Sequence, residues 1–163
     1  FVQDPWWRYY HHFTDYVARL SYLNAQGRHV ADIALFYPQS TFWTEHVLWD
    51  KSAAFNAVVE AFADISTALL RLQRDYDYLF EETLNDGSAR VERGRLLVGA
   101  ESFSIVVLPP LTTIPWRAME QLQAFAQGGG TLIALGQLPS HTSEQRADPR
   151  PDDFSGPAQV IQP

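Results

Sequence analysis

The sequence contains no cysteine and a single lysine, Lys51, among its 163 residues. The absence of cysteine excludes disulfide bonds, thiolate zinc sites and cysteine nucleophiles, and it leaves the redox compartment undefined. The 12 basic side chains are outnumbered by 19 acidic ones, for a net charge of −7. Nucleic acids and anionic membranes are bound by clustered lysine and arginine, so we expect neither as a partner.

Long hydrophobic runs, a signal peptide and internal repeats are also missing. No apolar run approaches the roughly 20 residues that span a bilayer, and the N-terminus lacks the basic and apolar regions of a signal peptide. With 46 % hydrophobic and 19 % charged residues, the chain can bury a core. We therefore expect one soluble globular domain. The sequence begins at Phe1 rather than at methionine, which suggests a piece of a longer protein.

Aromatic residues gather at the N-terminal end, where the first 50 positions hold 13 of the 22, including four of the five tryptophans. Apolar residues recur there at the spacing of an amphipathic helix, which predicts a helix over residues 5–26. They include Trp6, Tyr10, Phe13, Val17 and Leu20. One small sheet cannot cover so much apolar surface, so we expect this helix to lie at an interface.

Beyond this helix, short apolar runs alternate with helical patterns. The expected strands are residues 30–37, 75–80, 104–108 and 131–135, with a hairpin over 91–98, and the expected helices are residues 52–72 and a segment from Pro115 to Gly128. This alternation predicts an α/β fold, a flavodoxin-like (amidotransferase-like) doubly wound parallel sheet with an extra N-terminal helix.

These elements divide the chain into three segments. Residues 1–29 form the aromatic-rich helix, residues 30–139 form the doubly wound domain, and residues 140–163 are expected to be a linker or a disordered tail. The last segment contains few large apolar groups and several prolines and acids, so it cannot bury much surface.

Doubly wound sheets bind ligands beyond the carboxyl ends of their strands, which here predicts a site near residues 37–40 and 109–113. The substrate-binding candidates follow the first of these strands and are Trp43, Glu45, His46 and Trp49. They can form an aromatic and polar surface that contacts a sugar. The same tryptophans would serve an interface with a neighbouring domain equally well, and the aromatic first helix favours the interface.

No catalytic, metal or cofactor site is expected. The adjacent Glu81 and Glu82 could suggest a glycosidase acid/base pair, but neighbouring residues rarely face each other across a scissile bond, so we expect the opening of a turn or short helix. The five histidines include no pair at the i, i+4 spacing typical of zinc ligands. The glycines at 128–130 follow a helix and precede a strand, which indicates a helix stop rather than a phosphate loop.

Two N-terminal segments resemble a known family. Residues 5–23 (PWWRYYHHFTDYVARLSYL) and 27–38 (GRHVADIALFYP) resemble large bacterial glycoside hydrolases of the α-L-rhamnosidase type, glycoside hydrolase family 106. Residues 75–78, 107–109 and 128–134 also resemble segments of this family, in the same order along the chain. These later segments are also similar to the amidotransferase-like domain of family 42 β-galactosidases.

The resemblance implies a parent glycosidase, periplasmic or extracellular, in which an α/β domain follows a catalytic (β/α)₈ barrel. The first helix then corresponds to the end of that barrel, and the catalytic carboxylates lie upstream of this chain. A barrel needs about 250 residues, so this chain cannot contain one. The expected role is an accessory domain, inactive alone, whose partner is the missing barrel. The alternatives are a carbohydrate-binding module that uses Trp43 and Trp49, and a self-associating oligomerisation module.

Overall fold

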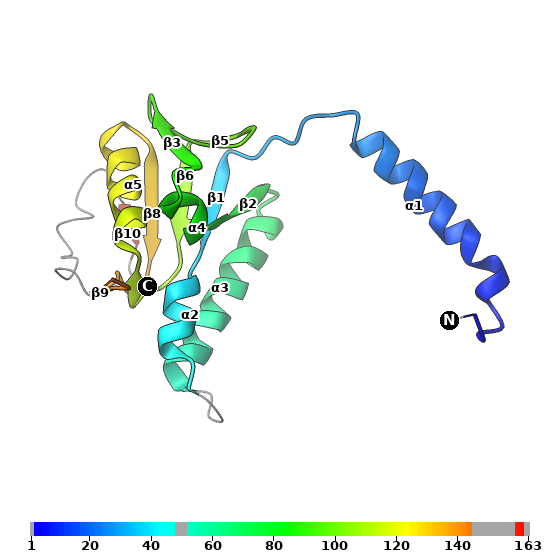
Figure 1. The fold of residues 1–163 in the computed structure, drawn as a ribbon, viewed down its shortest axis with the longest axis horizontal. Coiled ribbons are helices and arrows are strands. Elements are labelled where there is room, and N and C mark those ends of the chain that lie inside the picture. Colours follow the sequence, from blue (N-terminus) through cyan, green and yellow to red (C-terminus); the bar gives the residue numbers. More distant parts are fainter. Residues whose placement is uncertain (1, 48–51, 145–158, 162–163) are drawn as a thin grey trace. The chain divides into compact units, whose positions relative to one another are not determined.

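The computed structural model describes residues 2–47, 52–144 and 159–161. The chain forms two compact units, Phe1–Val30 and Ala31–Pro163 (Figure 1). The first unit consists of a short 3₁₀ helix, η1 (Trp7–Tyr9), and of α1 (Tyr10–Asn24). The predicted aromatic helix is confirmed, although its first turn is 3₁₀. The rings of Trp7 and Tyr10 stack across the junction, with their centroids 5.3 Å apart.

The second unit is built on a five-stranded parallel sheet with the order β10-β8-β6-β1-β2. Its strands are β1 (Ile33–Tyr37), β2 (Tyr76–Phe80), β6 (Ile105–Leu108), β8 (Thr131–Leu135) and β10 (Gln159–Ile161). Numbered along the chain within this sheet, the spatial order is 2-1-3-4-5, the flavodoxin-like arrangement. The predicted doubly wound α/β fold is confirmed, and the strand order reverses between β1 and β6.

Helices cover both faces of the sheet (Figure 1). On one face, α5 (Trp116–Gln127) buries Met119, Leu122 and Phe125 against alternate residues of the strands, such as Phe36. On the other face, the strand residues Ile33, Leu35 and Val107 pack against α3 (Ala53–Arg71). Because successive strand residues point to opposite faces, the continuous apolar runs of β1 and β6 supply both cores.

Helix α3 confirms the predicted helix over residues 52–72. Its N-cap is Ser52, whose Oγ accepts a hydrogen bond of 3.0 Å from the Phe55 N–H. By length and composition, α3 is apolar enough to cross a membrane, contrary to the expectation from the sequence. The outer side of the helix is rich in alanine, which extends the apolar character beyond the stripe of Phe62, Ile65 and Leu69 that packs against the sheet.

A three-stranded antiparallel sheet contains β3 (Ala89–Glu92), β4 (Arg95–Val98) and β5 (Glu101–Phe103). It confirms the predicted hairpin and adds β5. Arg95 fixes this sheet to the start of β1, since its guanidinium donates to Asp32 Oδ1 at 2.8 Å and to the Ser102 carbonyl at 2.7 Å. Gly94, in the β3–β4 turn, has φ +74° and approaches the loop after α5 so closely that a Cβ would lie 2.9 Å from the Gly128 carbonyl oxygen.

The remaining short elements follow the sequence-based expectation only in part. Residues 39–45, where the sequence predicts no helix or strand, form α2 (Gln39–Glu45). Helix α4 (Glu81–Asn85) stands where the sequence indicated a turn or a short helix. Strands β7 (Thr113–Ile114) and β9 (His141–Thr142) pair in parallel. Strands β9 and β10 both belong to the segment 140–163, which was expected to be a linker or disordered; residues 145–158 and 162–163 lie outside the described residues.

Candidate ligand cavity at the carboxyl edge of the sheet

A cavity of about 620 Å³ lies beyond the carboxyl ends of β1 and β2. Helix α2 follows β1 and α4 follows β2, and the two strands pair in parallel, so both helices begin at the same edge of the sheet. The lining residues are Gln39, Ser40, Trp43, Glu81, Glu82, Asn85, Asp86, Pro115 and Ser143. This is the edge at which doubly wound folds bind ligands.

Glu81 is the first residue of α4 and is only 4 % exposed. The Ser40 N–H donates to its two carboxyl oxygens at 3.0 and 3.1 Å, and the Ser40 hydroxyl donates to Oε2 at 2.5 Å. Glu81 therefore accepts N–H groups at the N-terminus of α2, which has no side-chain cap of its own. This contact explains why residues 39–45 are helical, although nothing near them in the sequence provides a cap.

Burial raises the pKa of Glu81 from 4.5 to about 6. The hydrogen bonds from Ser40 lower the pKa, while the nearby carboxylate of Glu144 raises it further. Loss of hydration, which disfavours the charged form, thus outweighs the hydrogen bonds, which favour it. The cavity wall therefore carries a carboxyl group that changes its charge in mildly acidic solution.

Thr41 connects the segments that follow β1 and β6, the two strands between which the strand order reverses. Its buried hydroxyl donates to the Thr113 carbonyl at 2.9 Å and accepts from the Thr112 and Thr113 N–H groups at 3.2 and 3.1 Å. The segments after β1 and β6 therefore lie side by side, as the sequence predicted for residues 37–40 and 109–113. Because Thr41 occupies the crevice between them, the open cavity lies beside it, toward β2.

Of the three predicted substrate-binding residues that the structure describes, one lines the cavity. Trp43 lines the cavity, and its side chain is 73 % exposed. Glu45 and His46 are not among the described lining residues, and the His46 ring packs against Phe55 with centroids 5.4 Å apart. Trp49 lies outside the described residues, so its assignment stays a prediction.

Sequence reasoning assigned no ligand-contacting role to Glu82, Asn85 or Asp86, which also line the cavity. They follow β2, whereas the predicted site used only the segments after β1 and β6. The pairing of β2 with β1 was the missing signal, because the segments that follow adjacent parallel strands meet at one edge of the sheet.

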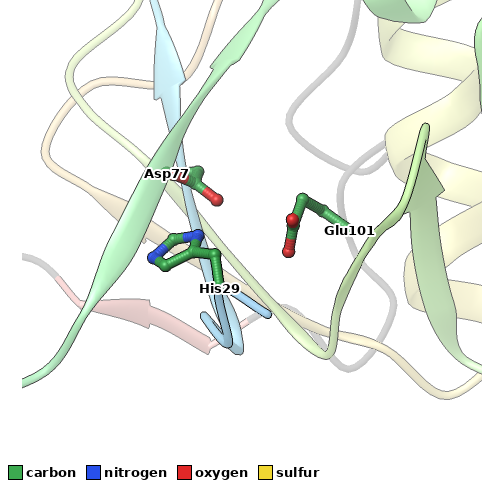
Figure 2. Close-up of side chains that lie close together, drawn as sticks. All are labelled: His29, Asp77 and Glu101. Atoms are coloured by element: carbon green, nitrogen blue, oxygen red, sulfur yellow. The ribbon is translucent and has the colours of Figure 1, made fainter. Parts of the chain in front are cut away.

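A second pair of carboxylates lies away from this cavity. Figure 2 shows Asp77 on β2 and Glu101 at the start of β5, and their carboxyl oxygens lie within 4.8 Å of one another. His29, labelled in the same view, belongs to the unit Phe1–Val30. Two carboxylates alone supply fewer ligands than calcium or zinc requires, so we assign no metal centre to them.

The strand order and the cavity at the carboxyl edge define the second unit as a doubly wound α/β unit. Residues 2–155 match the glycoside hydrolase family 106 model, described as alpha-L-rhamnosidase. The chain belongs to this family, which confirms the resemblance found in the sequence. Neither a curated protein nor a solved structure matches the chain.

Proposed function

We propose that this chain is a non-catalytic accessory part of an alpha-L-rhamnosidase-family glycoside hydrolase, and that the aromatic side of α1 docks onto the catalytic barrel. The aromatic side of α1 carries this proposal, since the unit Phe1–Val30 by itself buries no residue of this helix. Trp6 is 49 % exposed and Phe13 is 58 % exposed. Together with Tyr9 and Tyr10, they line an apolar cavity of about 360 Å³.

The length of α1 supports a docking role. Isolated helices of about 12–15 residues are marginal in water, and helices in proteins gain most of their stability from packing an apolar face. Helix α1 has 15 residues, and Tyr10, Phe13 and Leu20 lie along one side of it. A partner that covers this side would supply the missing packing.

The carboxylates of the larger cavity support a non-catalytic role. Glycoside hydrolysis requires an acid that reaches the glycosidic oxygen and a second carboxylate across the bond, about 5–9.5 Å away. Both carboxyl oxygens of Glu81 accept hydrogen bonds from Ser40, so this carboxyl group serves the N-terminus of α2. Glu82 is the next residue on the same short helix, and neighbouring helical side chains do not face each other.

Docking is tested by mixing the purified chain with the catalytic portion of a family enzyme and measuring the complex by size-exclusion chromatography with light scattering. Replacement of Tyr10 and Phe13 by serine should abolish the complex. Asp15→Ala, on the opposite side of α1, is the matched control and should leave it intact. Equal binding by both variants would contradict the proposed surface.

The non-catalytic role is tested with aryl α-L-rhamnosides, from which the chain alone should release no rhamnose. Turnover that disappears in Glu81→Gln would overturn the proposal. Saturable binding of rhamnosides, without any complex with the catalytic portion, would favour a carbohydrate-binding module instead. A trimer-sized mass for the chain alone would favour an oligomerisation module.

A further inference from the structure

Strand β2 lies at the rim of the parallel sheet (Figure 1). Among the strands that the structure describes, only β1 pairs with it. A strand at the rim presents backbone N–H and C=O groups to which another strand can bind, and proteins often protect such strands with lysine, proline or a bulge. Residues 76–80 contain neither lysine nor proline, and the one charged residue, Asp77, points to the face opposite that of Tyr76 and Tyr78.

An apolar surface lies beside this rim, on the face of the sheet that α3 covers. Tyr78 and Phe80 belong to this face and are each 47 % exposed. The Ser66 Oγ lies 3.5 Å from the Tyr78 hydroxyl oxygen, so the side of α3 that carries Ser66 faces the rim. Residues 59 and 70 lie on that same side of the helix. We call the exposed apolar side chains of this surface the β2–α3 patch: Val59, Leu70, Tyr78 and Phe80.

The β2–α3 patch concentrates the exposed apolar side chains of the unit Ala31–Pro163. Seven large apolar side chains are exposed in the described part of that unit, and four of them belong to the patch. The acidic residues of α3, Glu60 and Asp64, lie outside it. A contiguous exposed apolar patch marks an interaction site, and interfaces between identical subunits are more apolar than other interfaces.

The sequence of β2 is complementary to itself. In an antiparallel pair centred on Tyr78, this residue lies opposite Tyr78 of a second copy, and Tyr76 lies opposite Phe80 of that copy. Aromatic side chains therefore meet aromatic side chains on one face, and such cross-strand pairs stabilise a sheet. On the other face Asp77 lies opposite Leu79. A shift by one residue shortens the pairing, and in one direction it sets Asp77 opposite its own copy, which is unfavourable.

We propose that two copies of this chain form a dimer through the β2–α3 patch, with their β2 strands paired antiparallel across a two-fold axis at Tyr78. Two-fold symmetry requires the same residues on both sides of an interface, and the self-complementary β2 provides them. A different partner would not require β2 to match itself. The dimer uses only the unit Ala31–Pro163, so it does not depend on docking of α1.

The mass of the full chain in light scattering, over a series of protein concentrations, tests the dimer. We expect twice the 18.5 kDa of one chain. Tyr78→Lys sets two like charges opposite each other at the axis and should give the mass of one chain. Thr67→Lys, which adds the same charge to an exposed position of α3 outside the patch, is the matched control and should remain a dimer. Circular dichroism checks that both variants are folded.

Three results of this measurement would overturn the proposal. They are the mass of one chain at every concentration, a trimer-sized mass, and a dimer that persists in Tyr78→Lys. The first would assign the patch to another part of the parent enzyme. A dimer through α1 would give the last result, so an association through the aromatic helix cannot be mistaken for the proposed one.

The register is tested separately by disulfide formation, because the chain has no cysteine of its own. Tyr78→Cys places two cysteines opposite each other, within the Cα distance that a disulfide allows. Phe80→Cys is the matched control on the same face, since the two cysteines would then lie about 13 Å apart along the strands. Mild oxidation should link only Tyr78→Cys into a covalent dimer. Equal linkage of both variants, or none in Tyr78→Cys, would overturn the proposed pairing.

Discussion

The buried carboxyl group of Glu81 predicts an unusual dependence of stability on pH. Its pKa is raised from 4.5 to about 6 in the folded chain, a difference of about 1.5 pH units. Each unit corresponds to about 1.36 kcal/mol, so the contribution of this group to the free energy of unfolding changes by about 2 kcal/mol. Because the folded chain holds this proton more tightly than the unfolded chain, the contribution is fully present below about pH 4.5 and is lost as the pH rises through about 6.

The measurement compares the chain with Glu81→Gln, which has nearly the same shape and cannot ionise. Urea unfolding followed by circular dichroism gives the free energy of unfolding of each protein between about pH 4 and pH 7. All other titrating groups are shared, so the difference between the two proteins isolates Glu81. The stability of the unmodified chain relative to Glu81→Gln should fall by about 2 kcal/mol across this range. A constant difference, or one that rises with pH, would refute the reasoning.

Glu81→Ala separates the charge from the hydrogen bonds. This variant leaves the buried N–H and hydroxyl of Ser40 without their acceptor, so it should lose about 1–3 kcal/mol at every pH. A stability equal to that of Glu81→Gln at pH 4 would show that the capping of α2 contributes nothing.

Three further substitutions test the fold around the cavity by urea unfolding. Gly94 has φ +74°, and Gly94→Ala places a Cβ about 2.9 Å from the Gly128 carbonyl oxygen. The free energy of unfolding should fall by about 1–3 kcal/mol, and an unchanged value would contradict the close approach. Thr41→Val keeps the shape but removes the acceptor of the Thr113 N–H, and should cost about 1–3 kcal/mol; unchanged stability would mean that the crevice is not held by this hydroxyl. Ser52→Ala removes the N-cap of α3 and should lower the free energy of unfolding by about 1 kcal/mol. Recovery of this loss in Ser52→Asp would confirm the capping role.

The elements that were predicted correctly have clear signals within their own stretch of sequence. Helix α3 has an N-cap at Ser52 and a regular apolar stripe, and β6 is a β-branched run that ends at Pro109. Helix α2 could not be predicted, because its N-terminus is capped by Glu81, 41 residues from Ser40. Strands β7 and β9 have two residues each, too few for any periodicity to show.

The candidate site was partly predictable for a related reason. Trp43 could be placed after β1, because the carboxyl ends of parallel strands form the ligand-binding edge. Glu82 and Asp86 follow β2, and their proximity to Trp43 depends on which strand lies beside β1. The sequence gives the order of the strands along the chain but not their order in the sheet, and that order decides which side chains share a cavity.

Strand β10 has a consequence for how the chain can be shortened. It pairs with β8 over residues 159–161 and covers backbone groups that would otherwise form the rim of the sheet. A version that stops at residue 158 would expose the N–H and C=O groups of β8 as a template for another molecule. Such a truncated protein should precipitate or form edge-to-edge dimers, although it retains every residue of both cavities.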